Sequence, residues 1–221
     1  MPDQPSAAVQ DYLKAIHSLG GVEENVSPVH IAERLQVRAP SVTGMLKRLA
    51  EAGWISYESG QGAKLTEQGT AEARRVIRRH RLVELFLIKA LGLDWSEVDE
   101  EADALEHAIS PRLEQAIAKY LGEPLEDPHG HLIPTAEGQL SHRELQTLDN
   151  FRDGQQIIIR EVQDDNPARL RRWQTQGLIP GVVVKVRSYQ PLDDLFELEV
   201  DGNVIVLGSE ALVGIRGEEC S

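Results

Sequence analysis

The chain has 221 residues and 41% of them are hydrophobic, so it can bury a core and its composition excludes a disordered protein. The single cysteine, Cys220, excludes an internal disulfide framework and a cysteine-rich zinc site, and it suits a reducing cytosol. The sequence contains no apolar run as long as a membrane span and no secretory signal, so we expect a soluble cytoplasmic protein.

The formal net charge of −13 argues against a nucleic-acid partner, but the charges are unevenly distributed. Residues 30–81 hold ten Lys/Arg and five Asp/Glu, whereas residues 82–150 hold four and fifteen. The local charge decides what approaches each surface. The basic N-terminal region is therefore compatible with DNA, although segregation by chance would look the same.

Residues 1–72 are expected to form three short helices and a hairpin. "AAVQDYLKAIHSL" has apolar residues at helical spacing. Ser27 and Pro28 are typical of an N-cap and a first helical residue, and Gly53 can end the third helix, "APSVTGMLKRLAEA". "WISYESGQGAKLT" is typical of two strands around a glycine turn. This order predicts a winged helix-turn-helix.

The third helix would be the recognition helix of this motif. Its first turn would face base edges and phosphates, and the basic residues further along would contact the DNA backbone. The alternative is a small α+β domain without a ligand, but spacing, turn, hairpin and local charge all favour DNA binding. The predicted DNA-contacting residues are Arg38, Pro40, Ser41, Thr43, Lys47 and Arg48.

The middle of the chain is expected to be helical, with one long helix from after Thr66 to near Gly92 and two shorter ones, "WSEVDEEADALEHAI" and "SPRLEQAIAKYLG". The proline-rich stretch "GEPLEDPHGHLIPTAEG" is typical of a linker. His129 and His131 in this stretch look like metal ligands, but a proline-bounded loop is more typical of a turn that docks on the helical domain.

Carboxylates and imidazoles recur at helical spacing in these helices. His80 and Glu84 lie four residues apart, and Asp103, Glu106 and His107 would share one face with Asp99 nearby. Apolar residues border this face, and unpartnered carboxylates beside a core are costly. Oxygen and imidazole donors without thiolate suit Mn(II) or Fe(II), and by affinity order also Zn(II) or Co(II). A solvated acidic face is the alternative.

Short β-branched runs such as "QQIIIREV" and "NVIVLG" dominate the chain from residue 141 and predict a small barrel. We therefore expect a mainly α fold with β structure: an N-terminal winged helix-turn-helix, a helical domain and a C-terminal small β-barrel.

The sequence resembles the diphtheria toxin repressor/manganese transport regulator family over nearly its whole length. The resemblance rests on "IAERLQVRAPSVTGMLKRL", "RRHRLVELFL", "EADALEHAIS", "DPHGHLIP" and the β-rich tail. It implies a dimeric, metal-activated repressor of metal-uptake genes. The implied domains are a DNA-binding domain at 1–72, a metal-binding and dimerisation domain at 73–140, and an SH3-like domain at 141–221.

The resemblance also implies metal ligands. The main site would use Asp11, Asp103, Glu106 and His107, and a second site would use His80 and Glu84 with Asp99 close by. Iron-responsive members carry Met and Cys where this chain has Asp11 and Asp103. Replacing soft sulfur by hard oxygen favours manganese, with iron as the alternative and Zn(II), Co(II) or Cd(II) as ions that bind in vitro.

Two features depart from the family pattern. Manganese-type members carry an acid where this chain has Lys14, which affects a two-manganese arrangement. Iron-type members take an acid and an amide from the SH3-like domain, where this chain has Asn166 and Arg169; Asp164 or Asp165 would have to substitute.

The implied partners are a double-stranded operator and a second copy of the chain, with no membrane and no small organic substrate. The dimer interface would use Leu113, Ile117 and Leu121, unless these residues only pack within one chain. A metal bridging Asp11 to the dimerisation domain would set the spacing of two recognition helices.

Two other functions compete with this interpretation. A metal-dependent hydrolase lacks a recognisable motif, because there is no phosphate loop, nucleophile elbow or HExxH. A metal-independent winged-helix regulator leaves the aligned carboxylates and the β tail unexplained.

Overall fold

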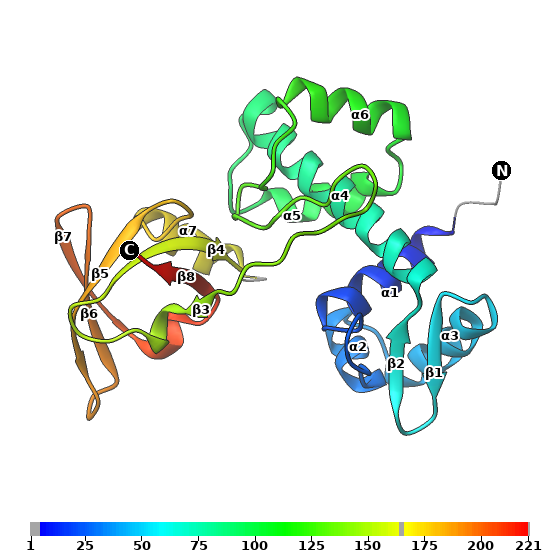
Figure 1. Ribbon diagram of the computed structural model, residues 1–221, viewed down its shortest axis with the longest axis horizontal. Coiled ribbons are helices and arrows are strands. Elements are labelled where there is room, and N and C mark those ends of the chain that lie inside the picture. The colour runs from blue at the N-terminus through cyan, green and yellow to red at the C-terminus, as the bar shows by residue number, and fades with distance from the viewer. Residues whose placement is uncertain (1–4, 164–165, 221) are drawn as a thin grey trace. The chain divides into compact units, whose positions relative to one another are not determined.

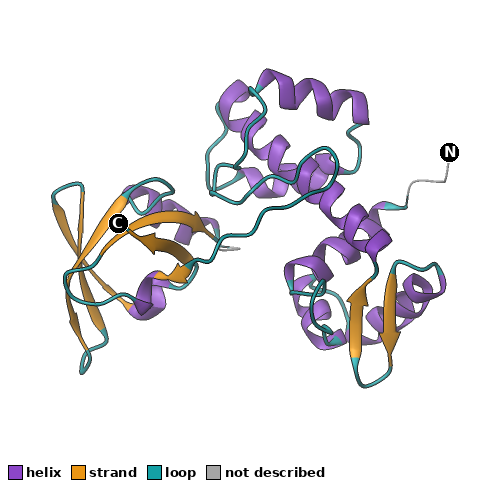
Figure 2. Ribbon diagram, viewed as in Figure 1, coloured by secondary structure: helices purple, strands orange, loops and turns teal. Residues whose placement is uncertain are grey.

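The computed structural model describes residues 5–163 and 166–220, whose helices and strands are shown in Figures 1 and 2. These residues form two compact units. The first unit contains the residues up to His80 together with 104–110 and 134–140. The second unit contains 81–103, 111–133 and the chain from Ser141 onward. Within the described part of the chain, no helix has both the length and the apolar character needed to cross a membrane.

The first unit begins with a winged helix-turn-helix. The side chain of Ser27 accepts the N–H of His30 at 3.3 Å and Pro28 follows it, so the second helix starts where the sequence predicts. Its elements are α1 (Ala7–Ser18), α2 (Pro28–Arg34), α3 (Ala39–Glu51), β1 (Ile55–Glu58) and β2 (Gly62–Leu65), with the two strands paired antiparallel.

Apolar residues at helical spacing form the core of this unit. Leu13 and Ile16 of α1 and Val42, Leu46 and Leu49 of α3 are all buried. Spacings of three and four residues put these side chains on one face of each helix, so the opposite face of α3 is left for other contacts.

Helix α4 (Glu67–Leu91) starts directly after the hairpin. A Cβ at Gly69 would lie 2.0 Å from the carbonyl oxygen of Trp54, so only glycine allows the helix to begin against the residue that precedes β1. The part of α4 from residue 81 onward belongs to the second unit, which also contains α6 (Pro111–Tyr120).

Helix α5 (Val98–Glu106) is shorter than the sequence predicts. The spacing predicts Asp103, Glu106 and His107 on one helical face, but the helix ends at Glu106 and His107 lies in the following turn. Pro111 disfavours a helical conformation of Ser110, so α5 and α6 cannot continue into one helix.

The segment expected to be a linker is packed rather than free. Asp127, His129 and Ile133 are buried, and the carbonyl oxygen of His129 accepts the N–H of Val162 at 2.9 Å. Gly130 has φ 88°, and a Cβ there would lie 1.8 Å from the carbonyl oxygen of Arg160, so glycine is required at this contact. This turn therefore lies against the C-terminal sheet.

The C-terminal part of the second unit is a six-stranded antiparallel sheet in the order β3-β8-β4-β5-β6-β7 (Figure 1). Its core includes Trp173, which lies on a helix between the fourth and fifth strands, and Phe196 of the sheet itself. The strands are β3 (Gln146–Thr147), β4 (Gln156–Val162), β5 (Val183–Gln190), β6 (Leu195–Val200), β7 (Asn203–Gly208) and β8 (Ile215–Glu219), with α7 (Pro167–Thr175) and the 3-10 turns η1 (Leu148–Asn150) and η2 (Ser209–Leu212).

Candidate metal centre and DNA-reading surface

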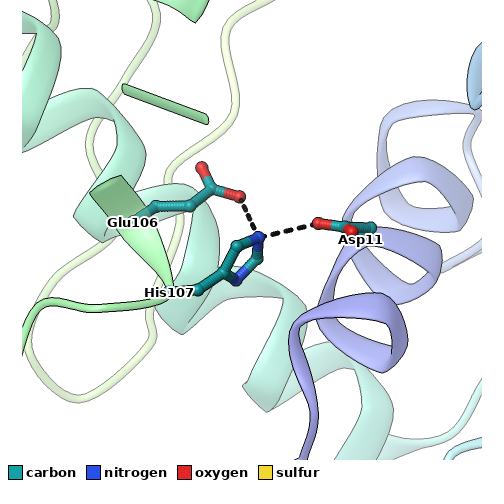
Figure 3. A group of neighbouring side chains, drawn as sticks. All are labelled: Asp11, Glu106 and His107. Atoms are coloured by element: carbon teal, nitrogen blue, oxygen red, sulfur yellow. Dashed lines mark ion pairs between the residues drawn. The ribbon is translucent and has the colours of Figure 1, made fainter. Parts of the chain in front are cut away.

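Asp11, Glu106 and His107 converge in the first unit (Figure 3). The Nε2 atom of His107 lies 2.8 Å from Oδ1 of Asp11 and 3.5 Å from Oε1 of Glu106. One ligand atom from each residue lies within 4.8 Å of the others. Glu106 is 1% exposed and Asp11 is 46% exposed, so the cluster has a buried side and a side open to water ligands.

Two further residues orient the imidazole of His107. Its Nδ1 lies 2.7 Å from Oε1 of Gln10, and Nε2 of Gln10 donates to Oε1 of Glu72 at 2.8 Å. An Nδ1–H donated to Gln10 leaves the Nε2 lone pair for a metal, which is how outer partners commonly orient histidine ligands. Sequence reasoning missed Gln10 and Glu72. The available signal was a glutamine three residues before Leu13, on the apolar stripe of α1.

The carboxyl group of Asp11 is electrostatically balanced between opposing neighbours. Burial raises the pKa of Asp11 above its usual value, and Glu106 acts in the same direction, while His107 and Lys14 oppose it. A divalent cation would compete with the proton at this carboxylate.

Lys14 reaches the other side of Glu106. Its Nζ lies 2.8 Å from Oε2 of Glu106 and 2.9 Å from Nδ1 of His80, and Nδ1 of His80 is itself hydrogen-bonded to Oε2 of Glu106 at 2.7 Å. The two oxygens of Glu106 therefore have different partners: Oε1 faces His107 and Oε2 faces Lys14 and His80.

The remaining predicted ligands are distributed over both units. His80 and Glu84 are buried in α4, four residues apart, and Asp99 and Asp103 are exposed on α5. The predicted second site combines residues of the two units and stays a prediction.

Within the second unit, Glu84 lies beside His129, with Oε1 3.4 Å from Nδ1. Burial lowers the pKa of His129, but Glu84 and Asp127 outweigh it, so the pKa is raised overall. The rings of His129 and Trp95 are 4.7 Å apart, and Trp95 in turn packs against the core of the sheet. The turn that carries His129 therefore docks on the helices, as the alternative to a ligand role predicts.

The candidate ligands from the C-terminal domain have other contacts. The Asn166 side chain caps α7 by accepting the N–H of Ala168 at 2.9 Å. Arg169 donates to the carbonyl oxygen of Glu210, and its guanidinium lies over the ring of Trp173. Asp164 and Asp165 lie outside the described residues.

Arg38 directly precedes α3 as its N-cap residue, and the other predicted DNA-contacting residues lie on α3 away from its buried stripe. Thr43 is half-buried, and the other five are exposed: Arg38, Pro40, Ser41, Lys47 and Arg48. The exposed start of α3 carries hydroxyl and guanidinium groups, and Lys47 and Arg48 follow further along the helix. Recognition helices of helix-turn-helix proteins enter the major groove of DNA with their N-terminal residues in this way.

Helix α6 carries the predicted dimer contacts. Leu113 is 49% exposed, Ile117 is buried and Leu121 is half-buried just beyond the helix end. Leu113 is therefore available to contact a second chain, whereas Ile117 is packed in the core of its own chain. This arrangement is compatible with a dimer interface on α6.

The reading helix, the hard-donor cluster and the C-terminal sheet together define a metal-responsive DNA-binding regulator. Family models agree: the iron-dependent repressor N-terminal DNA-binding domain matches residues 6–63, the metal-binding and dimerisation domain of the same repressors matches 66–135, and a FeoA domain matches 146–218. The chain belongs to the diphtheria toxin repressor/manganese transport regulator family of metal-dependent transcriptional repressors.

Individual relatives span most of the chain. The iron-dependent repressor IdeR of Mycobacterium leprae is 31% identical over 211 residues, which cover 89% of this chain and 86% of that protein. A solved structure of a manganese-dependent transcriptional repressor in complex with manganese is 34% identical, covers 96% of this chain and 100% of its own, and superposes with a TM-score of 0.89. A structure of ScaR with bound Zn2+ is 31% identical, covers 98% of this chain and 100% of its own, and has a TM-score of 0.80. The FeoA match supports the SH3-like fold of the C-terminal domain, and these relatives support the repressor class.

Proposed function

We propose that this repressor is activated by Mn(II), with Asp11, Glu106 and His107 as the central ligands and Asp103 as a further one. The observation that carries the proposal is the convergence of two carboxylates and one imidazole within 4.8 Å, with no sulfur among the three donors. Such a donor set fits Mn(II) and also Fe(II). Fe(II) is the second candidate because the chain resembles an iron-dependent repressor.

Affinity alone does not identify the physiological ion. Zn(II) and Co(II) bind most nitrogen–oxygen sites more tightly than Mn(II), so these ions, and Cd(II), are expected to bind in vitro. His80 and Glu84, with Asp99, are the proposed ligands of any second ion.

The proposed mechanism couples this site to the DNA reader. Asp11 lies on α1, the helix that contributes Leu13 and Ile16 to the reader's core, whereas Glu106 is the last residue of α5 and His107 follows it. The bound ion supplies the positive charge that holds these carboxylates together. Asp11 then ties α1 to the end of α5, and the recognition helix takes the orientation that DNA requires. By linkage, DNA must tighten metal binding by the same factor.

The proposed partners follow from the same arrangement. Two chains would pair through α6 with Leu113, Ile117 and Leu121, and would place two recognition helices on successive half-sites of a double-stranded operator. We propose that the operators control metal-uptake genes and that the protein acts in the cytoplasm.

Titrating Mn(II) into the pure protein tests the proposal. The DNA is a duplex that the protein itself selects from a random pool in the presence of Mn(II). We expect saturating Mn(II) to raise the affinity for this duplex by about 10- to 100-fold. In the Asp11→Ala variant, part of the metal binding should survive but this increase should largely disappear. An operator affinity that does not respond to Mn(II) or Fe(II) would reject the proposal.

Substitutions on α3 test the DNA-reading surface separately. Lys47→Ala should weaken binding to all duplexes alike and reduce the slope of log affinity against log salt by about 1, because one phosphate is no longer neutralised. Arg38→Ala should instead reduce discrimination between the selected duplex and one altered in its half-sites. Fluorescence anisotropy at several salt concentrations measures both effects. Lys185→Ala, which removes an exposed lysine from β5, is the matched control and should change neither.

A further inference from the structure

The position of Lys14 indicates how many ions the site can take. Lys14 follows Asp11 by one helical turn, so both side chains leave α1 on the same face. Its ammonium nitrogen is 2.8 Å from a carboxylate oxygen of Glu106 and 2.9 Å from a ring nitrogen of His80. A carboxylate oxygen and an imidazole nitrogen are donors that a divalent cation would also use, and here they surround a positive charge that belongs to the chain.

Glu106 has the geometry of a bridging carboxylate. Its Oε1 faces His107 and therefore the Asp11 cluster, while its Oε2 faces Lys14 and His80. The Glu106 side chain is almost completely buried and that of Lys14 is 22% exposed, so the ammonium is held against the carboxylate with little access to water. Charge-assisted hydrogen bonds in such surroundings are short and well oriented.

From these contacts we propose that the ammonium of Lys14 fills the second cation position of a site bridged by Glu106. The chain then binds one divalent ion at this bridge, between Asp11, Glu106 and His107, and the other side of Glu106 carries a fixed charge of +1. This inference rests on the proposed function, because it assumes that the Asp11 cluster binds metal.

Two consequences follow from a fixed cation. It cannot be removed by a chelator, so Glu106 stays oriented in the metal-free protein. It also means that only one metal ion binds at Glu106 in each chain. The fraction of Asp11 clusters that hold an ion should therefore rise hyperbolically with the concentration of free metal.

Metal counting with electron paramagnetic resonance of Mn(II) tests the inference on the full chain. We expect the wild-type protein to show isolated Mn(II) at the Asp11 cluster, without the spin-coupled signal of two ions sharing a carboxylate. In Lys14→Glu, a carboxylate replaces the ammonium, so a second ion can join Glu106 and His80. Equilibrium dialysis should then find one more Mn(II) per chain, and the spectrum should show a coupled pair.

Lys14→Arg is the matched control, because it keeps the positive charge and should keep the wild-type ion count and spectrum. A coupled pair in the wild-type protein overturns the inference, and so does an unchanged ion count in Lys14→Glu. Both outcomes leave metal activation itself intact, whereas a wild-type protein that binds no Mn(II) overturns the proposed function as well. The wild-type spectrum alone decides the question if Lys14→Glu does not fold.

Discussion

Replacing Glu106 by glutamine is expected to lower the affinity for Mn(II) by about 100-fold or more and to remove metal-dependent DNA binding. The two carboxylate oxygens serve different partners, since one faces His107 and the other faces Lys14 and His80. An amide of the same shape keeps one acceptor and loses the negative charge. Competition with a metal indicator dye measures the affinity, and anisotropy of the selected duplex measures the DNA response.

The same substitution should also lower stability, because it leaves the ammonium of Lys14 without its carboxylate. Breaking a buried ion pair costs about 3–5 kcal/mol, but Lys14 is partly exposed, so we expect the free energy of unfolding to fall by about 2 kcal/mol. Urea unfolding measures this loss. Glu101→Gln makes the same chemical change at an exposed position of α5 and is the control. Mn(II) affinity equal to that of the control would exclude Glu106 as a ligand.

Replacing Asp127 by asparagine is expected to destabilise the second unit by about 3 kcal/mol. The Oδ1 atom of Asp127 accepts the N–H groups of His129 and His131 at 2.8 and 3.0 Å, and Oδ2 lies 3.0 Å from the ring of His131 and 3.5 Å from Nε of Arg81. Asparagine can replace one acceptor but places an N–H₂ group against a donor or a cation. Urea unfolding followed by Trp fluorescence measures the loss.

The pH dependence of stability gives a second test of Asp127. Burial alone would raise its pKa, but His131, Arg81 and His129 outweigh burial and lower the pKa from 3.8 to about 2. A carboxyl group with a depressed folded pKa stabilises the protein above its unfolded pKa. This contribution, about 2 kcal/mol, should be lost as the pH falls from about 4 towards 2. In Asp127→Asn the corresponding part of the pH profile should be flat.

The exposed Glu137 provides a matched control, because Glu137→Gln makes the equivalent change in the same connecting segment. It should alter neither the unfolding free energy at neutral pH nor the acid limb of the profile. If Asp127→Asn behaved like this control, the ion pairs of the docking turn would contribute nothing to stability.

Most elements of this fold could be predicted because each one is specified by its own residues. Val42, Leu46 and Leu49 repeat at helical spacing, and the β-branched run "QIIIREV" forms β4. Strand β8 was not expected, since "IRGEE" has little β character of its own and is held in place by pairing with β4. The early end of α5 was also missed, because the charged pattern continues past the point where the backbone leaves the helix.

The family resemblance placed Asp11 with Glu106 and His107 in one site, whereas residue spacing alone could group only the ligands within each helix. Spacing works within a helix because neighbouring turns bring residues three or four apart onto one face. It carries no information on which distant helix supplies the remaining donor. That is why the proposed ligands Glu106 and His107 could be grouped from the sequence, while Asp11 depended on the resemblance.

By itself, the sequence determined most of the helices and strands, the kinds of donor atoms available and the basic face of α3, since all of these depend on local periodicity and side-chain chemistry. Only the tertiary structure decided that Gln10 orients His107 from 97 residues away and that Lys14 contacts Glu106 from 92 residues away. Such contacts are set by how whole helices pack, and small differences in packing decide whether a lysine faces solvent or a buried carboxylate.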